Sequence, residues 1–326
     1  LARAEGPYLP IVPDSVQIVD LCAPRVLRSL PGLVRYLRKS RPVALLSALD
    51  HANVVALWAQ KLARVSTRVV VTVHNTPSVS SARAPTLLGR LMPYWVKPFY
   101  PWAHAIVVVS KGAADDLMRC VEPPARKVHV IYNPIVTPDL FHRAEAPLSH
   151  AWFQPGQPPV ILGVGRLTLQ KDFPTLLRAF AIVQAQRPAR LMILGEGELR
   201  AELEHLAAQL GIKDKLALPG FVENPYPYLK GAAVFVLSSR WEGLPTVLVE
   251  ALALGTPVVS TNCPSGPAEV LAECNYGKLV PIGDVESMAQ AILEAMQQPR
   301  PVVNDHCLRR FSLAYSVREY AKILGI

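Results

Sequence analysis

The feature that most constrains the fold is a repeated alternation of short apolar, β-branched runs with segments of helical character. In the first half, strands are expected at 16–19, 43–47, 68–73, 105–109 and 127–131, with helices between them at about 26–38, 51–63, 86–100 and 111–120. Strands that alternate with helices favour a parallel sheet covered on both faces. The first half therefore predicts an α/β domain of the doubly wound type.

The second half repeats this alternation. Strands are expected near 159–164, 190–194, 215–219, 233–237, 257–260 and 278–280, and helices near 174–186, 198–210, 225–231, 245–254, 266–273 and 285–297. A chain of 326 residues favours two domains of about 150 residues over a single one. We expect a first domain over 1–145, a second over 146–305, and a last segment over 306–326 whose helix packs back on the first domain. The proline-rich segment 138–159 is expected to link the domains.

The amino-acid composition limits the classes of protein to which the chain can belong. The chain is 51% hydrophobic and 18% charged, which suits buried cores and not disorder. Its 34 basic and 25 acidic residues give a net charge of +9, which suits a nucleic acid, an anionic membrane surface or an anionic substrate. No Arg/Lys run with interleaved aromatic residues occurs, so nucleic acid is not expected as a partner.

The cysteines and the apolar runs bear on location. The five cysteines are scattered and lack CxxC spacing, so reduced thiols and a cytoplasmic location are expected. No apolar run in the sequence reaches the roughly 20 residues that span a bilayer.

A loop and helix after the apolar run 233–237 predict an anion site. Gly243 and Pro245 lie just before the expected helix, and proline is tolerated at a first helical position because its missing N–H has no partner there. The free N–H groups and positive dipole end of such a helix favour a phosphate. Glu242 and Glu250 flank the helix start, and a carboxylate beside a phosphate is favourable when it binds neutral hydroxyls. This combination indicates a sugar nucleotide.

A second glycine turn supplies positive charge. Gly163 and Gly165 let the backbone approach a ligand, while Arg166 and Lys171 carry the charge that a diphosphate needs. Position 168 is Thr, so the GxGxxG dinucleotide fingerprint fails. Asp172 is expected to be the N-cap of the next helix.

Further motifs complete a pattern that resembles a known family. GVGR…K, GEGE, LPGF, SSRWEGLP…VEALALGTPVV and CPSGPAEVL, in this order, resemble the retaining GT-B glycosyltransferases of family 4, whose E-x7-E element is matched by Glu242 and Glu250. The resemblance is specific over about 155–285 and looser in the first half, where VTVHN, VVVSKGAADDL and IYNP fit it. It implies the GT-B architecture, in which two Rossmann-like domains face a cleft, the second holding a UDP- or GDP-sugar and the first presenting the acceptor.

The resemblance also implies roles for individual residues. Glu242 and His74 are the implied catalytic residues near the transferred sugar; Arg166 and Lys171 face the donor diphosphate, and Glu250 binds the ribose. Further donor contacts are implied for Gly165, Gly243, Leu244, Pro245, Thr246, Phe221 and Val222, and acceptor-side contacts for Asn75, Ser110 and Asn133. Three alternatives stay open: Glu242 as a helix-capping acid, His74 as a hydrogen-bonded strand-end residue, and Phe221 as an ordinary core residue.

The expected activity is transfer of a sugar, with retention, to a glycan or lipid-linked acceptor in bacterial surface polysaccharide or lipopolysaccharide assembly. The only co-substrate expected is the nucleotide sugar, and because no DxD-type acidic motif occurs, no metal is expected. The alternatives are a non-catalytic nucleotide-sugar-binding fragment and a GT-B sugar-nucleotide epimerase.

Two further expectations concern the first half. Residues 83–103 alternate basic with large apolar side chains, which predicts a peripheral segment on anionic lipid at the inner face of the cell membrane; a partly buried helix is the alternative. Family members open with a strand and a glycine-rich loop, and nothing similar precedes Val16. We therefore expect either that this chain lacks its opening strand, loop and helix, or that its first domain is degenerate.

Overall fold

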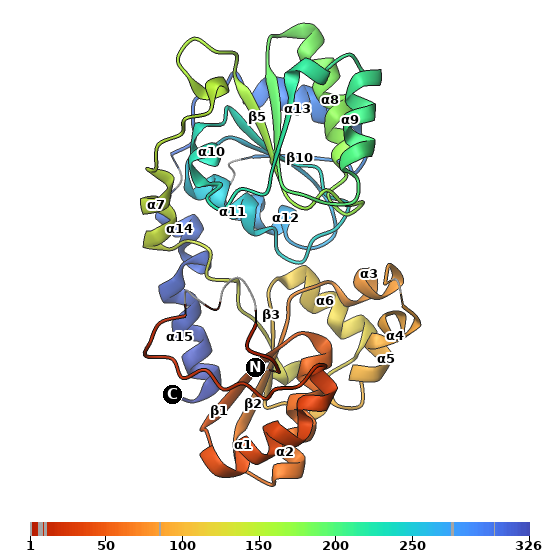
Figure 1. Ribbon diagram of the computed structural model, residues 1–326, viewed down its shortest axis with the longest axis vertical. Helices are drawn as coiled ribbons and strands as arrows, with labels where there is room; N and C mark the ends of the chain where they lie inside the picture. Colours follow the sequence, from red (N-terminus) through yellow and green to blue (C-terminus); the bar gives the residue numbers. More distant parts are fainter. Residues whose placement is uncertain (1, 6–8, 10–11, 85, 275–276, 303) are drawn as a thin grey trace. The chain divides into compact units, whose positions relative to one another are not determined.

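The structure is a computed structural model that describes residues 2–5, 9, 12–84, 86–274, 277–302 and 304–326. It contains two compact α/β units, each built on a parallel sheet (Figure 1). The first unit comprises Leu1–Val109, Ala113–Ile131 and Arg318–Ile326, and the second comprises Ser110–Gly112 and Tyr132–Val317. The expected α/β class with two parallel-sheet domains is confirmed.

The sheet of the first unit has the order β1-β2-β3-β4. Its strands are β1 (Ala44–Ala48), β2 (Arg68–Val73), β3 (Ala105–Val108) and β4 (Val128–Val130), and its larger helices are α1 (Leu30–Ser40), α2 (Asp50–Ala63) and α6 (Lys111–Cys120). One face of β2 and β3 packs on α2 and α6 through a cluster that includes Val71, Ile106 and Leu117. These strands are β-branched and buried, which is why the sequence pattern predicted them.

Two expectations for the first unit are wrong. Residues 16–19 form no strand, and Val16 and Ile18 are exposed. The single helix expected at 86–100 is divided into α4 (Leu87–Arg90), α5 (Met92–Val96) and a 3-10 turn (Tyr100–Trp102), preceded by α3 (Pro77–Ala82). Pro93 lies in the first turn of α5, where its missing N–H prevents a continuous helix.

The last helix, α15 (Leu313–Leu324), packs on the first unit through its final turns. Tyr320, Ile323 and Leu324 lie against a cluster formed by Val70, Ala105, Val107 and Ile131. The division between the units falls within this helix, between Val317 and Arg318.

Another division falls between Ile131 and Tyr132, earlier than the expected boundary at 145. The expectation that 138–159 is only a linker is wrong, because it contains α7 (Pro138–Ala144) and a 3-10 turn (Ala151–Phe153). Thr137 caps α7 by accepting a hydrogen bond from the Leu140 N–H, and Pro138 follows as the first helical residue.

The sheet of the second unit has the order β10-β9-β8-β5-β6-β7. Its strands are β5 (Val160–Val164), β6 (Arg190–Leu194), β7 (Leu216–Gly220), β8 (Val234–Leu237), β9 (Val258–Thr261) and β10 (Lys278–Val280). Its helices are α8 (Phe173–Gln186), α9 (Arg200–Gln209), α10 (Tyr226–Gly231), α11 (Thr246–Ala253), α12 (Pro267–Cys274), α13 (Val285–Ala295) and the short α14 (Asp305–Leu308). A large apolar cluster packs α8, α9 and α13 on one face of this sheet (Figure 1).

The strand order places a topological switch point between β5 and β8. From β5 the chain proceeds outward to β6 and β7, and then returns to place β8 on the other side of β5 before continuing to β9 and β10. The loops that leave β5 and β8 therefore diverge at the carboxyl edge of the sheet. Open α/β sheets bind their ligands at such a point.

The cysteine thiols differ in part from expectation. Cys22, Cys120 and Cys263 are free, but Cys307 is disulfide-bonded, so the expectation of reduced thiols is wrong at Cys307. Within the described residues, none of the helices is both long enough and apolar enough to span a membrane.

Candidate functional site

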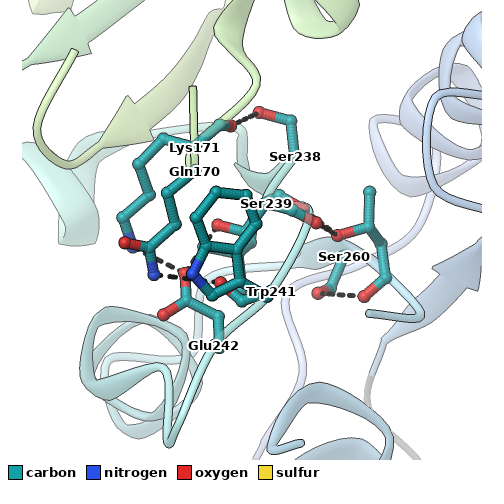
Figure 2. A network of polar contacts seen from close by, with 9 residues as sticks. Gln170, Lys171, Ser238, Ser239, Trp241, Glu242 and Ser260 are labelled. Atoms are coloured by element: carbon teal, nitrogen blue, oxygen red, sulfur yellow. Dashed lines mark hydrogen bonds and ion pairs between the residues drawn. The ribbon is translucent and has the colours of Figure 1, made fainter. Parts of the chain in front are cut away.

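The two loops at the switch point are joined by a network of hydrogen bonds (Figure 2). The Ser238 hydroxyl donates to the Lys171 carbonyl at 2.6 Å, and the Arg240 N–H donates to the Gln170 carbonyl at 2.8 Å. The Gln170 amide donates in return to the Trp241 carbonyl at 3.0 Å. The loop after β5 and the loop after β8 are thus held together as one structure.

An ion pair between Lys171 and Glu242 lies within this network. The Lys171 Nζ is 2.6 Å from the Glu242 Oε1, and the Ser239 hydroxyl also donates to that oxygen at 2.6 Å (Figure 2). The two charged side chains are only 17% and 8% exposed. A buried carboxylate needs such partners because desolvation disfavours its charge.

The helix-capping interpretation of Glu242 is wrong. The N-cap position of α11 is occupied by Pro245, whose side chain makes no capping hydrogen bond. The Glu242 carboxylate instead accepts from Lys171 and Ser239.

Glycine is required where the loop after β5 passes beneath the Lys171 side chain. Gly165 has a φ of 155°, and a Cβ there would lie 2.9 Å from the Lys171 Cε. A Cβ on Gly195, after β6, would lie 2.0 Å from the Gly165 carbonyl oxygen. The glycine turns therefore bring the backbone close to the aliphatic part of the Lys171 side chain. Arg166, on the same loop, is exposed.

A second ion pair links the two loops. Asp172 occupies the N-cap position of α8 as expected, but its side chain makes no bond to a helix N–H. Its buried carboxylate accepts from the Thr175 hydroxyl at 3.0 Å and lies 3.1 Å from the Arg240 Nε. Arg240 thus neutralises a charge that would otherwise be buried alone.

The start of α11 adds a positive dipole end next to these loops. Gly243, Leu244 and Pro245 lead into the helix; Leu244 and Pro245 are buried, and Thr246, the first helical residue, is exposed. The first turn of α11 contains no acidic residue, so its dipole is not neutralised locally.

Glu250 lies in α11 and is half-buried. Burial raises its pKa to about 7, and the Arg143 guanidinium acts in the opposite direction. In the part of the chain that the structure describes, no hydrogen bond or ion pair engages the Glu250 carboxylate. A buried carboxylate without a donor can accept hydrogen bonds from hydroxyl groups of a ligand. Arg143 belongs to none of the motifs recognised in the sequence.

The expected donor contacts Phe221 and Val222 follow β7. Phe221 is 76% exposed, so the interpretation of Phe221 as a core residue is wrong. Val222 is half-buried, and the Gly220 carbonyl accepts from the Gly195 N–H at 2.8 Å. This bond joins the β7 end to the β6 turn.

His74 and Asn75 lie after β2 in the first unit, and both are exposed. The His74 Nε2 is 3.0 Å from the Thr72 hydroxyl, a contact that a strand-end residue and a ligand-facing residue can both make. Desolvation lowers the His74 pKa, and the Asp50 carboxylate partly opposes this change. Ser110 follows the end of β3, and Asn133 is half-buried in the second unit. The catalytic and acceptor roles of these residues stay predictions.

The residue ranges that the structure describes hold no group of three or more His, Cys, Asp or Glu side chains that is arranged to bind a metal ion.

Two family profiles match the chain. The profile described as Glycosyl transferases group 1 matches residues 148–309, and that of Glycosyltransferase Family 4 matches residues 2–138.

Individual proteins are also similar. An uncharacterized glycosyltransferase of Methanocaldococcus jannaschii is 30% identical over 76% of this chain and 62% of its own length. The N-acetylgalactosamine-N,N'-diacetylbacillosaminyl-diphospho-undecaprenol 4-alpha-N-acetylgalactosaminyltransferase of Campylobacter jejuni is 31% identical over 77% of this chain and 66% of its own. The chain thus spans about two thirds or less of the length of these relatives.

A solved structure shares the fold. The Anabaena protein HepE, in complex with UDP and glucose, superposes with a TM-score of 0.72 at 19% identity, covering 91% of this chain and 81% of that protein. Likeness at this identity establishes a common two-domain architecture.

Proposed function

Because this chain belongs to the GT-B glycosyltransferases of family 4, we propose that it transfers a sugar from a nucleotide-diphosphate sugar to a glycan or lipid-linked acceptor. The observation that carries the proposal is the Lys171–Glu242 ion pair at the switch point of the second sheet. It puts a cation and an acid side by side where two loops and a helix start meet. That arrangement suits a donor with a diphosphate at one end and sugar hydroxyls at the other.

The donor diphosphate would be bound by positive groups of the second unit. Lys171 lies against Gly165, Arg166 stands on the same loop, and α11 begins just beyond the Glu242 loop. Preorganised positive groups stabilise the charge that builds up on a leaving group. We propose that they do so here in place of a metal ion, and that Glu242 stays near the sugar hydroxyls.

The reaction would proceed with retention of configuration. The bond from the sugar C1 to the β-phosphate oxygen breaks, and a bond from C1 to the acceptor oxygen forms on the same face. The acceptor hydroxyl proton passes to the departing phosphate oxygen. His74 is assigned to the transferred sugar, with Asn75, Ser110 and Asn133 on the acceptor side.

The nucleoside would lie farther along the second unit. Glu250 offers two acceptor oxygens for the ribose hydroxyls, and its carboxylate has no hydrogen-bond donor in the described protein. Phe221, 76% exposed, and Val222 would border the base.

We further propose that residues 83–103 rest on an anionic membrane surface. The α4–α5 apolar patch, formed by Leu87, Leu88, Leu91, Tyr94 and Trp95, is exposed, whereas Pro93 and Val96 of the same segment are buried. Arg90 adds positive charge beside it, and Lys97, which follows α5, lies 2.9 Å from the Glu122 carboxylate. An apolar patch with basic residues fits the headgroup region of anionic lipid. The relative from Campylobacter jejuni carries a lipid-linked acceptor in its name.

Vesicle sedimentation tests this surface. The Leu88→Ser/Trp95→Ser variant should bind phosphatidylglycerol vesicles more weakly than the wild type, because it removes two exposed apolar side chains. Leu62→Ser, which changes an exposed leucine on α2, is the matched control and should bind like the wild type. Equal binding by all three proteins would reject the assignment.

Nucleotide screening followed by a transfer assay tests the function itself. UDP or GDP should raise the melting temperature, since a ligand that binds only the folded state stabilises it. Release of the nucleoside diphosphate should then depend on an acceptor, and NMR of the product should show the anomeric configuration of the donor. Binding without transfer would favour the non-catalytic alternative, and conversion of the sugar nucleotide without an acceptor would favour the epimerase.

A further inference from the structure

A buried hydroxyl in the first unit has two polar neighbours. Thr72 is the next-to-last residue of β2, and its side chain is buried. Its hydroxyl oxygen lies 3.0 Å from the Ser47 carbonyl oxygen on the neighbouring strand β1, and 3.0 Å from the His74 Nε2. The two contacts meet at one oxygen atom, so its single hydrogen decides how both of them are made.

The backbone of Thr72 is held by a helix as well as by the sheet. The Asn53 side chain on α2 donates through Nδ2 to the Thr72 carbonyl at 2.9 Å and to the Tyr100 hydroxyl oxygen at 3.2 Å. The Tyr100 hydroxyl in turn donates to the Asp50 carboxylate at 2.8 Å. Asn53 and Tyr100 are both buried. These hydrogen bonds fix the place of Thr72 relative to α2.

The hydrogen of the Thr72 hydroxyl is directed to Ser47. A backbone carbonyl cannot donate, so the contact with Ser47 is a hydrogen bond only when Thr72 donates. If the hydrogen pointed to His74 instead, two oxygen atoms would face each other at 3.0 Å with no hydrogen between them. With its hydrogen on the Ser47 side, Thr72 accepts from His74. The His74 Nε2 then carries a proton.

A proton on Nε2 leaves the other ring nitrogen of His74 as an acceptor. Desolvation lowers the His74 pKa from its ordinary value of 6.5, and the Asp50 carboxylate partly opposes this change. A neutral imidazole has one N–H and one acceptor nitrogen. Among the described residues, none forms a hydrogen bond with Nδ1 of His74, and the side chain is exposed. A hydroxyl group of a ligand can therefore donate to Nδ1.

We propose that Thr72 is a positioning residue for sugar transfer, which holds the His74 ring in its Nε2–H form so that Nδ1 accepts a hydrogen bond from a hydroxyl of the transferred sugar. The proposal rests on the proposed function in assigning His74 to that sugar. It also concerns specificity. A sugar hydroxyl can donate to Nδ1, whereas a sugar carboxylate only accepts and finds no hydrogen there.

Nitrogen-15 NMR of the histidine rings tests the hold of Thr72 on His74. Protonated and unprotonated ring nitrogens differ in chemical shift, and the signals lost in His74→Gln identify the ring. At a pH of about 8, where a histidine of ordinary pKa is neutral, the wild type should have its proton on Nε2. His104 is an internal reference for this form, because its Nδ1 accepts from the Val69 N–H at 3.1 Å.

Three variants separate the effect of the hydroxyl from that of the fold. Thr72→Val keeps the shape of the side chain and removes the hydroxyl, so the Nδ1–H form of His74 should appear beside the Nε2–H form. Thr72→Ser keeps the hydroxyl and should keep the wild-type form. Thr67→Val is the matched control. Thr67 is also buried and precedes β2, and its hydroxyl donates to the Pro42 carbonyl at 2.8 Å, a hydrogen bond that involves no histidine.

Transfer assays test the consequence for the sugar. In Thr72→Val, kcat/KM for the donor should fall about fivefold, the value that corresponds to one lost hydrogen bond. The affinity for UDP or GDP, which lack the sugar, should stay the same, because His74 is assigned to the sugar alone. Thr67→Val should match the wild type in both measurements.

Four results would overturn the proposal. The first is a wild-type His74 ring with its proton on Nδ1, and the second is the wild-type proton distribution in Thr72→Val. The third is an equal change in Thr67→Val, which would mean that loss of any buried hydroxyl near this strand disturbs His74. The fourth is an altered ring in Thr72→Val with an unchanged kcat/KM. A wild type that transfers no sugar would count against the proposed function alone, because the NMR spectra still decide whether Thr72 fixes the ring.

Discussion

Replacing Glu250 by Gln should make the protein more stable at alkaline pH and leave its stability unchanged in acid. The folded protein raises the pKa of Glu250 from its ordinary value of 4.5 to about 7, chiefly through burial. One pKa unit corresponds to about 1.4 kcal/mol. The difference of about 2.5 units therefore comes to about 3 kcal/mol of unfolding free energy.

The sign follows from the direction of the pKa change. Because the folded state holds the Glu250 proton more tightly than the unfolded state, stability falls as the pH rises from about 4.5 to about 7, and the full cost is present above that range. Glutamine has a similar shape and no charge, so Glu250→Gln removes the cost. The variant should match the wild type near pH 4 and exceed it by about 3 kcal/mol near pH 8.

Chemical unfolding at a series of pH values measures this difference. Glu202→Gln, which changes an exposed acid on α9, is the matched control and should show no comparable trend. A constant difference between Glu250→Gln and the wild type across the pH range, or a loss of stability at pH 8, would refute the reasoning. Glu250→Gln should also bind nucleotides more weakly. Glu250 would then be a residue that is needed for binding but lowers the stability of the folded protein.

Three further predictions concern the same unit. Lys171→Met leaves the Glu242 carboxylate buried without its cation and should cost about 3 kcal/mol in chemical unfolding; addition of Glu242→Gln should recover part of that loss, and no recovery would argue against the pair. Gly195→Ala puts a Cβ 2.0 Å from the Gly165 carbonyl oxygen and should lower stability by at least about 2 kcal/mol, which a melting temperature equal to the wild type would contradict. Sugar transfer should continue in excess EDTA, since positive side chains are proposed to replace a metal; activity restored only by added Mg²⁺ or Mn²⁺ would reject that assignment.

The strand series was the part of the fold best predicted by the sequence. Strands such as β3 and β5 are short, apolar and buried on both faces, so their pattern reflects the parallel sheet directly. Residues 16–19 have the same β-branched character, yet Val16 and Ile18 are exposed and the run pairs with no strand in the described structure. The composition of a segment does not show whether another strand lies beside it in the folded protein.

The sequence contains signals from which helix α7 could have been predicted. Thr137 and Pro138 are typical of a helix N-cap and of a first helical residue. The other prolines of this segment indicated a linker instead. The break near Pro93 was likewise visible as a proline within an expected helix.

The candidate site was predictable in its residues but not in its pairing. The glycines and the E-x7-E spacing identified Gly165, Lys171 and Glu242. That Lys171 bonds to Glu242 depends on β5 lying next to β8, which is a property of the sheet order. Arg143 was missed because its position over the Tyr226 ring depends on the packing of α7 on α10, for which the sequence gives no local signal.

Calorimetric titration of UDP and GDP into the wild type, Lys171→Ala and Glu250→Ala tests the central claim most directly. The account predicts binding to the wild type, a loss of roughly 1.5–3 kcal/mol for Lys171→Ala because a charge-assisted contact to the diphosphate disappears, and weaker binding for Glu250→Ala. Circular dichroism should confirm that each variant is folded. Nucleotide affinity unchanged in both folded variants would contradict the assignment of this loop pair as the donor site.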